Sequence, residues 1–388
     1  MSVTAPAGFL ANGVAAGIKA SGDLDLAVVA AAGGAVAAAA VFTTNGAAAA
    51  PVLVSRAHLA TSGGRVRAVV LNSGCANAAT GAAGVQAAEA TCATLATELG
   101  CRPAEILVCS TGLIGIPLAI DRLLGALPAA VAGLGGGAEE GGRAATAILT
   151  TDTHAKTVLV EREGFSVGGM VKGAGMIAPH MATMLCVLTT DAAATPEALD
   201  AALRLGVRDS FNELVVDGCT STNDTVIVLA SGAGRAVTDK ELAGALAEAC
   251  ADLAGQLAED AEGTTKVAAI EVRGAASDAD ARAAGRRVAL SLLVKTSLYG
   301  ADPYWGRVVS ELGASGSAFD LDRVSVSYGG IEVCSGGVGI EHDRQAVAAH
   351  MAGGRIELRC DLHLGDFSAT VLTTDLGHGY IDENMRTS

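Results

Sequence analysis

The longest uncharged stretch of the chain runs from Leu26 to Ser55, and it restricts the possible folds more than any other feature. It is mostly alanine, interrupted by Gly33, Gly34 and the polar residues 43–45. A membrane-spanning helix needs about 20 strongly apolar residues, and alanine adds little apolar surface. The stretch therefore predicts two buried strands with a turn between them, not a membrane span.

Small side chains must fill the core. Hydrophobic residues make up 51% of the 388 residues but aromatic residues only 3%, and the 50 glycines imply many tight turns. The length suggests two or three domains. The composition changes to mainly Ala, Asp and Gly near residues 274–286, and we therefore expect a domain boundary after residue 275. We thus expect an N-terminal catalytic domain of residues 1–275 and a smaller α/β domain of residues 276–388.

Charge and cysteine usage exclude several classes of function. The net charge is −15 and the basic residues form no run, whereas a nucleic-acid partner needs clustered Lys and Arg. The nine cysteines include no C-x-x-C pair, so neither a zinc ribbon nor a redox dithiol is predicted. We therefore expect buried free thiols and no metal site. We also expect a cytoplasmic protein, because the start shows no signal-peptide pattern.

Several elements can be predicted from local signals. Thr195 followed by proline is expected to cap a helix. A capping box from Thr238 to Glu241 opens another helix, which should end near Gly263. Residues 66–71 and 106–109 are short apolar runs that indicate buried strands. The Gly-rich residues 133–142 indicate a surface loop.

The last third of the chain indicates strands and hairpins. Apolar residues alternate on both sides of Gly329-Gly330, which predicts a hairpin. Two more alternating segments, residues 356–362 and 367–371, are joined through a turn at Gly365-Asp366.

The Ala182-Thr183 bond is a candidate site of self-cleavage. A threonine hydroxyl can attack the carbonyl of its own preceding peptide, and water then releases a new N-terminus. The freed threonine carries its α-amine as a base beside its hydroxyl, which is a known class of nucleophile. That amine has a pKa near 7.7–8.0. From the residues alone, an ordinary structural Ala-Thr step remains the alternative.

Two further candidates lie elsewhere in the chain. Thr111 and Gly112 follow a predicted strand, where a hydroxyl and a backbone N–H could face a developing oxyanion; an ordinary strand-end turn is the alternative. Lys172 lies in a Gly-rich, apolar neighbourhood, where it either reaches solvent or binds an anion.

These candidates belong to a longer series of motifs that spans nearly the whole chain. The motifs are APAGF (5–9), GIK (17–19), LNSGCAN (71–77), TG (80–81), STG (110–112), TTDT (150–153), KGAGM (172–176), MATML (181–185), STNDT (221–225), DAEG (260–263) with Lys266, and WGR (305–307). In this order they resemble the ornithine acetyltransferase family, the bifunctional glutamate N-acetyltransferases of arginine biosynthesis.

The resemblance implies a fold and a reaction. The fold would be α/β, a layered α-β-β-α sandwich of the type shared with self-processing aminopeptidases. Cleavage between Ala182 and Thr183 would give an α chain of residues 1–182 and a β chain of residues 183–388, assembled as α2β2. Thr183 would take an acetyl group from N-acetylornithine and pass it to glutamate in a ping-pong reaction.

The resemblance also implies the site. Thr111 and Gly112 would form the oxyanion hole, and the substrate-binding residues would be Thr150, Lys172, Thr183, Glu262, Asn384 and Ser388. No cofactor is implied, although acetyl-CoA could be a co-substrate. The C-terminus is one residue shorter than the family pattern, and Cys75, Ala79 and Tyr304 depart from the pattern elsewhere.

Two other functions remain possible at this point. One is a self-processing aminopeptidase or amidohydrolase of the same architecture, although such relatives typically have serine at the position of Thr183. The other is an uncleaved, non-enzymatic binding protein, which the intact set of motifs disfavours.

Overall fold

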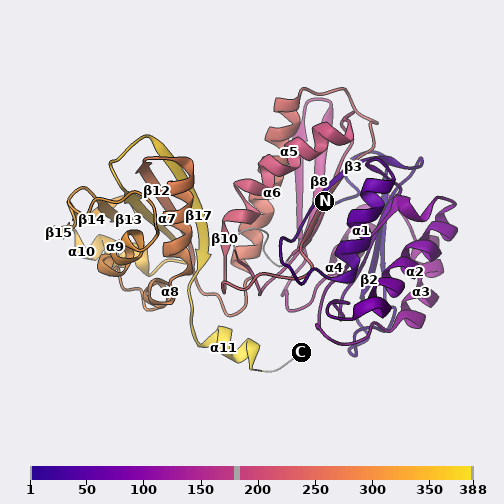
Figure 1. Ribbon diagram of the computed structural model, residues 1–388, viewed down its shortest axis with the longest axis horizontal. Helices are drawn as coiled ribbons and strands as arrows, with labels where there is room; N and C mark the ends of the chain where they lie inside the picture. Colours follow the sequence, from indigo (N-terminus) through magenta and orange to yellow (C-terminus); the bar gives the residue numbers. More distant parts are fainter. Residues whose placement is uncertain (1, 179–183, 386–388) are drawn as a thin grey trace.

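The structure, a computed structural model, describes residues 2–178 and 184–385 and consists of two lobes (Figure 1). The larger lobe contains two stacked β-sheets with helices on both outer faces, and the smaller lobe contains one sheet with helices packed on it. Apart from residues 214–215, which join its sheet, the chain enters the smaller lobe after residue 266. Its last helix, α11 (His378–Asn384), turns back towards the larger lobe.

The first sheet of the larger lobe has the order β1-β2-β5-β6, with helices on its outer face. The sequence forms these strands because each is a short run of small apolar residues, and all six residues of β2 are buried. The strands are β1 (Phe9–Val14), β2 (Leu26–Ala31), β5 (Ala68–Asn72) and β6 (Ile106–Ser110), and the helices are α1 (Ala50–Thr61), α2 (Gly81–Leu99) and α3 (Ile120–Ala132).

The second sheet has the order β4-β3-β11-β9-β8-β7, and helices α5 and α6 cover its outer face. Its strands are β4 (Arg65–Val66), β3 (Val36–Phe42), β11 (Thr225–Ala230), β9 (Leu185–Thr190), β8 (Phe165–Lys172) and β7 (Lys156–Arg162). The helices are α5 (Pro196–Arg208), α6 (Asp239–Glu259) and α4 (Ala138–Ala147), the last of which packs on β1.

Alternation within the uncharged stretch explains how the sheets stack. Leu26, Val28 and Ala30 of β2 face the helices, whereas the residues between them face the second sheet. Strand β3, which follows β2 after a short turn, contributes alanines to the same inter-sheet core. The prediction of two buried strands is confirmed, but the strands lie in different sheets. The expected α-β-β-α sandwich is therefore also present.

The smaller lobe is built on a seven-stranded sheet with the order β10-β17-β12-β16-β13-β14-β15. The hairpin predicted at Gly329-Gly330 is confirmed, since β13 and β14 pair antiparallel there. The strands are β10 (Leu214–Val215), β12 (Val267–Ala275), β13 (Ser325–Tyr328), β14 (Ile331–Ser335), β15 (Val338–Gly339), β16 (Arg355–Asp361) and β17 (Phe367–Thr374). The helices are α7 (Asp278–Leu290), α8 (Leu292–Tyr299), α9 (Trp305–Gly313) and α10 (Arg344–Met351).

Strand β12 lies between the two strands joined through Gly365-Asp366. Strand β16 pairs parallel with β12 on one side, and β17 pairs antiparallel with it on the other. The turn at Gly365-Asp366 therefore crosses over β12 rather than closing a hairpin. A boundary after residue 275 falls at the end of β12, a central strand of the smaller lobe's sheet, and the division at that residue remains a proposal.

The helix caps follow the sequence closely, with one difference. Thr195 accepts a hydrogen bond at the start of α5, and Thr238 forms a capping box with Glu241 at the start of α6. The prediction of a loop over residues 133–142 is wrong in its second half, where α4 begins at Ala138. A Cβ at Gly141 would lie 1.9 Å from the Ser2 hydroxyl oxygen, so this glycine serves close packing within a helix.

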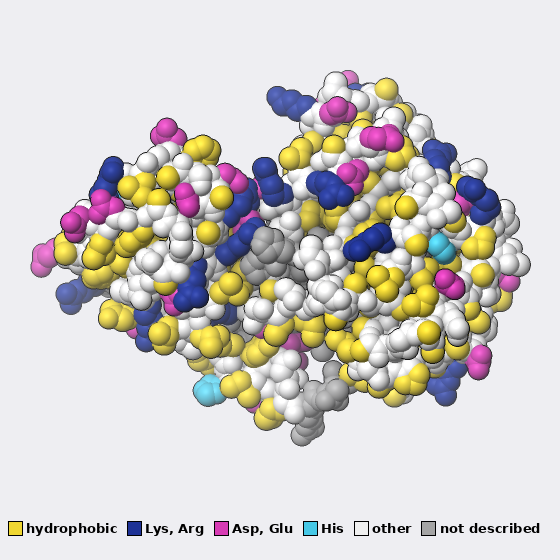
Figure 2. Space-filling model, viewed as in Figure 1, with side chains coloured by type: hydrophobic (Ala, Val, Ile, Leu, Met, Phe, Trp, Pro, Cys, Tyr) yellow, Lys and Arg dark blue, Asp and Glu magenta, His cyan; other side chains and the backbone are white. Residues whose placement is uncertain are grey.

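The prediction of buried free thiols is confirmed for most of the cysteines. Figure 2 shows basic and acidic side chains on both lobes of the face drawn, with both kinds side by side where the lobes meet. All nine cysteines are free thiols, and seven of them are buried. In the part of the chain that the structure describes, no helix has the length and apolarity needed to cross a bilayer.

Candidate active site

A cavity of about 700 Å³ lies in the larger lobe where β5, β6 and β8 end, and the end of α11 reaches it. The six predicted site residues that the structure describes all line it, although they come from five separate parts of the chain. They are Thr111, Gly112, Thr150, Lys172, Glu262 and Asn384. Ala182, Thr183 and Ser388 lie outside the described residues.

Thr111 and Gly112 directly follow β6, and their backbone is tightly held. The Thr111 N–H donates to the Asn72 carbonyl at 2.9 Å, so its backbone is not free to bind a ligand. Gly112 has φ +123°, and a Cβ there would lie 2.4 Å from the Gly74 carbonyl carbon. Only glycine fits this position. The Gly112 N–H has no hydrogen bond to another described residue, which leaves it available as a donor.

Lys172, at the end of β8, places a cation behind the Thr111 hydroxyl. Its side chain is only 4% exposed, and its Nζ donates to Thr150 Oγ1 at 2.7 Å and to Thr111 Oγ1 at 3.2 Å. The Thr111 hydroxyl accepts from Lys172 and therefore has its own proton to donate to another group. Burial lowers the pKa of Lys172, and the nearby Asp152 opposes that effect.

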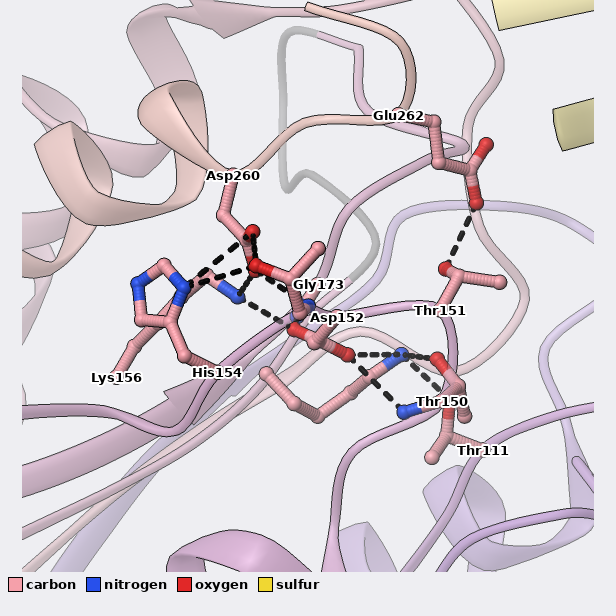
Figure 3. A network of polar contacts seen from close by, with 11 residues as sticks. Thr111, Thr150, Thr151, Asp152, His154, Lys156, Gly173, Asp260 and Glu262 are labelled. Atoms are coloured by element: carbon pink, nitrogen blue, oxygen red, sulfur yellow. Dashed lines mark hydrogen bonds and ion pairs between the residues drawn. The ribbon is translucent and has the colours of Figure 1, made fainter.

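Three consecutive residues between α4 and β7 contact three different parts of the site (Figure 3). Thr150 accepts from Lys172, Thr151 donates to Glu262 Oε1 at 2.7 Å, and Asp152 accepts from the Gly173 N–H at 2.7 Å. This segment therefore joins the end of β8 to the loop after α6. The resemblance implied a role for Thr150 alone.

A buried network of charges lies beneath this segment. Asp152 contacts the ammonium of Lys156 at 2.7 Å and that of Lys172 at 3.9 Å, and Lys156 also contacts Asp260 at 2.5 Å. Burial favours a raised pKa for Asp152, but the two lysines and the Gly173 N–H outweigh it and hold the pKa at about 2. No role was predicted from the sequence for these carboxylates or for Lys156. The spacing of Asp152 and Lys156, ahead of an apolar strand, was the available signal.

Glu262 connects the last helix to the site. Its Oε2 accepts from the Asn384 side chain at 2.8 Å. The loop after α6 approaches α11 closely, because Gly263 has φ +65° and a Cβ there would lie 2.0 Å from the Tyr380 nitrogen. A negative charge and an amide thus line the cavity that Lys172 also lines.

Two aspartates accept hydrogen bonds from the backbone on either side of residues 179–183. Asp217 accepts from the backbone N–H groups of Met176 and Ile177, at 2.6 and 3.0 Å. Asp224 accepts from the Met184 N–H at 3.2 Å. Asp224 is fully buried, and burial raises its pKa well above the usual range. The described residues on either side of 179–183 therefore lie beside the cavity-lining elements.

The arrangement can stabilise negative charge that develops on a carbonyl oxygen. The Thr111 hydroxyl, polarised by Lys172, and the Gly112 N–H are two donors on one side of the cavity, which is the pattern of an oxyanion hole. Lys172 and Glu262 offer one positive and one negative group to a small zwitterionic ligand. Acyl transfer is the reaction class that uses both features.

Known proteins resemble the chain over nearly its whole length. The sequence profile of the ArgJ family matches residues 10–387. The chain is 51% identical over 391 aligned positions to the "Arginine biosynthesis bifunctional protein ArgJ" of Mycolicibacterium paratuberculosis, covering 98% of this chain and 95% of the relative. It is 50% identical to the protein of that name from Thermobifida fusca, covering 99% of both.

Solved structures also resemble the chain. The Bacillus halodurans arginine biosynthesis bifunctional protein is 33% identical with a TM-score of 0.49, and the match covers 51% of this chain and 96% of that one. The Mycobacterium tuberculosis ornithine acetyltransferase, solved with ornithine, is 48% identical with a TM-score of 0.44. That match covers 47% of this chain and 96% of the solved chain.

Proposed function

The chain belongs to the ArgJ family, and from that premise we propose that it transfers an acetyl group from N2-acetylornithine to glutamate in arginine biosynthesis. The products would be ornithine and N-acetylglutamate. The relatives' names give the pathway, and the resemblance of the sequence motifs supplies the donor and the acceptor.

One observation carries the proposal beyond family membership: Lys172, Thr111 and Glu262 converge on one cavity from distant parts of the chain. A cation, a hydroxyl donor and a carboxylate are what this reaction needs. Both substrates are amino acids with an α-carboxylate, and Lys172 is the cation that such a group requires. Glu262 can meet the ammonium group of one substrate.

The proposed reaction begins with cleavage of the Ala182-Thr183 bond, which frees the Thr183 α-amine. This amine takes the hydroxyl proton as Thr183 Oγ attacks the acetyl carbonyl of acetylornithine. The Thr111 hydroxyl and the Gly112 N–H stabilise the tetrahedral oxyanion. The C–N bond then breaks, the leaving amine takes the proton, and acetyl-Thr183 remains.

The second half of the reaction reverses these roles. The neutral amine of glutamate attacks the acetyl ester, and the same donors stabilise the second oxyanion. The Thr183 α-amine takes the proton that the attacking nitrogen loses and passes it to Thr183 Oγ as the ester C–O bond breaks. Because one cavity serves both substrates in turn, Thr150 and Asn384 would act as adaptable polar contacts for either side chain.

Three further points belong to the same proposal. Acetyl-CoA would be a second acetyl donor, which fits the word "bifunctional" in the relatives' names. The α and β chains would assemble as α2β2 in the cytoplasm. Ser388, outside the described residues, would contact the substrate beside Asn384.

Denaturing mass spectrometry together with an acceptor assay tests the proposal. The purified protein should give fragments 1–182 and 183–388, and Thr183→Ser should still cleave, whereas Thr183→Ala should remain one chain. Incubation with acetylornithine alone should add one acetyl group to fragment 183–388, and glutamate should then remove it. Cleavage of the Thr183→Ala variant, or transfer without an adduct, would refute the Thr183 mechanism.

The choice of acceptor separates this function from the alternatives. Labelled acetyl should appear on glutamate; its appearance as free acetate at the same rate with and without glutamate would indicate a hydrolase of the aminopeptidase type. An uncleaved protein that binds acetylornithine without turnover would indicate a binding protein.

A further inference from the structure

Two buried lysines share one carboxylate behind the candidate oxyanion hole. The Asp152 side chain is fully buried and lies 2.7 Å from Lys156 Nζ and 3.9 Å from Lys172 Nζ. Lys156 is also fully buried, whereas Lys172 opens onto the cavity. Figure 3 shows Asp152 in the middle of this network, with Asp260 and Lys156 on the side away from Thr111.

The network alternates in charge from the cavity inwards: Lys172, Asp152, Lys156, Asp260. Asp260 is held by Lys156 at 2.5 Å and by the Thr153 N–H at 3.0 Å, and His154 lies 3.4 Å from it at the surface. Among the described residues, Lys156 thus has two carboxylate partners within 4 Å, whereas Lys172 has one, the more distant oxygen of Asp152. A change on any member of the series changes the electrostatic field at Lys172.

Other charged groups also face Lys172. Asp224, before β11, and Glu262, after α6, stabilise its charged form, and Lys156 on β7 destabilises it. Asp152 also fixes the backbone next to the lysine through its side chain. Its carboxylate accepts from the N–H of Thr150 at 3.1 Å and from that of Gly173, the residue after Lys172, at 2.7 Å. The same carboxylate therefore orients both the lysine and the threonine that the lysine contacts.

We propose that Asp152 is a positioning residue for acyl transfer, which holds the Lys172 ammonium against the Thr111 hydroxyl. Lys156 partly neutralises the Asp152 carboxylate and so determines how strongly that carboxylate stabilises the charged form of Lys172. A charged Lys172 makes the Thr111 O–H a stronger donor to the oxyanion, and a neutral Lys172 does not. The role in acyl transfer rests on the proposed function, but the electrostatic coupling can be measured without it.

The proposal predicts opposite effects for two substitutions. Asp152→Asn removes the nearest anion, so Lys172 should lose its proton at lower pH. The substitution also places an amide N–H donor against backbone N–H groups that, in the wild type, donate hydrogen bonds to the carboxylate. Lys156→Met removes a competing cation, so Lys172 should keep its proton to higher pH. A purely structural role for Asp152 predicts no such opposition, because both substitutions would only loosen the fold.

Trace labelling with acetic anhydride over a pH series measures this directly, since only a neutral amine reacts. Mass spectrometry of the peptide that contains Lys172 gives the pH midpoint, with the exposed Lys240 as an internal reference. We expect the midpoint to fall by about one pH unit or more in Asp152→Asn and to rise in Lys156→Met. The double variant should return towards wild type.

Unchanged midpoints, or shifts of the two single variants in the same direction, would overturn the proposal. If Asp152→Asn does not fold, the labelling midpoint of Lys172 in Lys156→Met decides alone: a rise supports the proposal and no rise overturns it. The alkaline limb of the kcat/KM profile should shift in parallel with the labelling midpoint. Shifted midpoints without any acetyl transfer would instead refute the proposed function, and normal transfer with unshifted midpoints would refute only the role of Asp152.

Discussion

Asn384 donates its side-chain N–H to Glu262 Oε2 at 2.8 Å, although 122 residues separate the two in the sequence. The bond brings the end of the last helix to the cavity wall formed by the loop after α6. The smaller lobe therefore contributes to a site that otherwise belongs to the larger one.

Replacing Asn384 should affect substrate binding and not the fold. Asn384→Ala removes the bond to Glu262 and one polar group from the cavity, so we expect kcat/KM for acetylornithine to fall about tenfold, roughly 1.4 kcal/mol. The two-fragment pattern should remain. Glu383→Ala on the same exposed helix is the matched control and should leave the kinetics unchanged. Equal activity of both variants with wild type would remove Asn384 from the site.

Replacing Thr111 should slow the chemical step. Loss of one oxyanion donor typically lowers kcat by about 10²–10³, roughly 2.7–4 kcal/mol, and Thr111→Ala should show a decrease of that size with an unchanged thermal midpoint. Thr111→Ser keeps the hydroxyl that accepts from Lys172 and should retain most of the activity. A decrease of less than about threefold in Thr111→Ala would mean that Thr111 is only a turn residue.

Gly112 should be intolerant of any side chain, for two separable reasons. Its φ of +123° is unfavourable for other residues, which costs about 1–3 kcal/mol, and a Cβ would also clash with the Gly74 carbonyl carbon at 2.4 Å. Gly115 has φ +84° but open space around its Cβ position. Gly112→Ala should therefore lower the free energy of unfolding more than Gly115→Ala does, as measured by urea denaturation. Equal losses would show that the close approach to Gly74 has no energetic effect.

Lys295 should give the stability of the protein a distinctive pH dependence. It is buried in the smaller lobe, where its Nζ donates to Thr373 Oγ1 and the Thr374 carbonyl, and burial lowers its pKa to about 7. Between pH 7 and the ordinary lysine pKa, the unfolded chain binds a proton that the folded chain does not. Stability therefore rises with pH in this window, by up to about 1.4 kcal/mol per pH unit.

The comparison of wild type with Lys295→Met isolates this effect. The difference in free energy of unfolding between the two should shift in favour of wild type as pH rises from 7 to 9. Lys240→Met, at an exposed position, should show no such trend. A constant difference across this range would mean that Lys295 stays protonated in the folded protein.

Local sequence signals were sufficient wherever the determinants lie within a few residues of each other. The Thr195 and Thr238 caps and the hairpin at Gly329-Gly330 were predicted because caps and tight turns depend on neighbours along the chain. The prediction of a loop over residues 133–142 was wrong in its second half, at helix α4, for the opposite reason. Gly141 within this helix lies against Ser2 and Thr4, which are far away in sequence.

The sequence by itself also determined which residues belong to the candidate site, through ordered motifs that identify a family, and it named Thr111, Gly112, Thr150, Lys172, Glu262 and Asn384. Only the tertiary structure decided how they act together. The stacking of two sheets brings β6 and β8 to one cavity, and this places Lys172 against Thr111 and Asp152 between two buried lysines. Such contacts depend on distances between separate elements, and no local pattern encodes those distances.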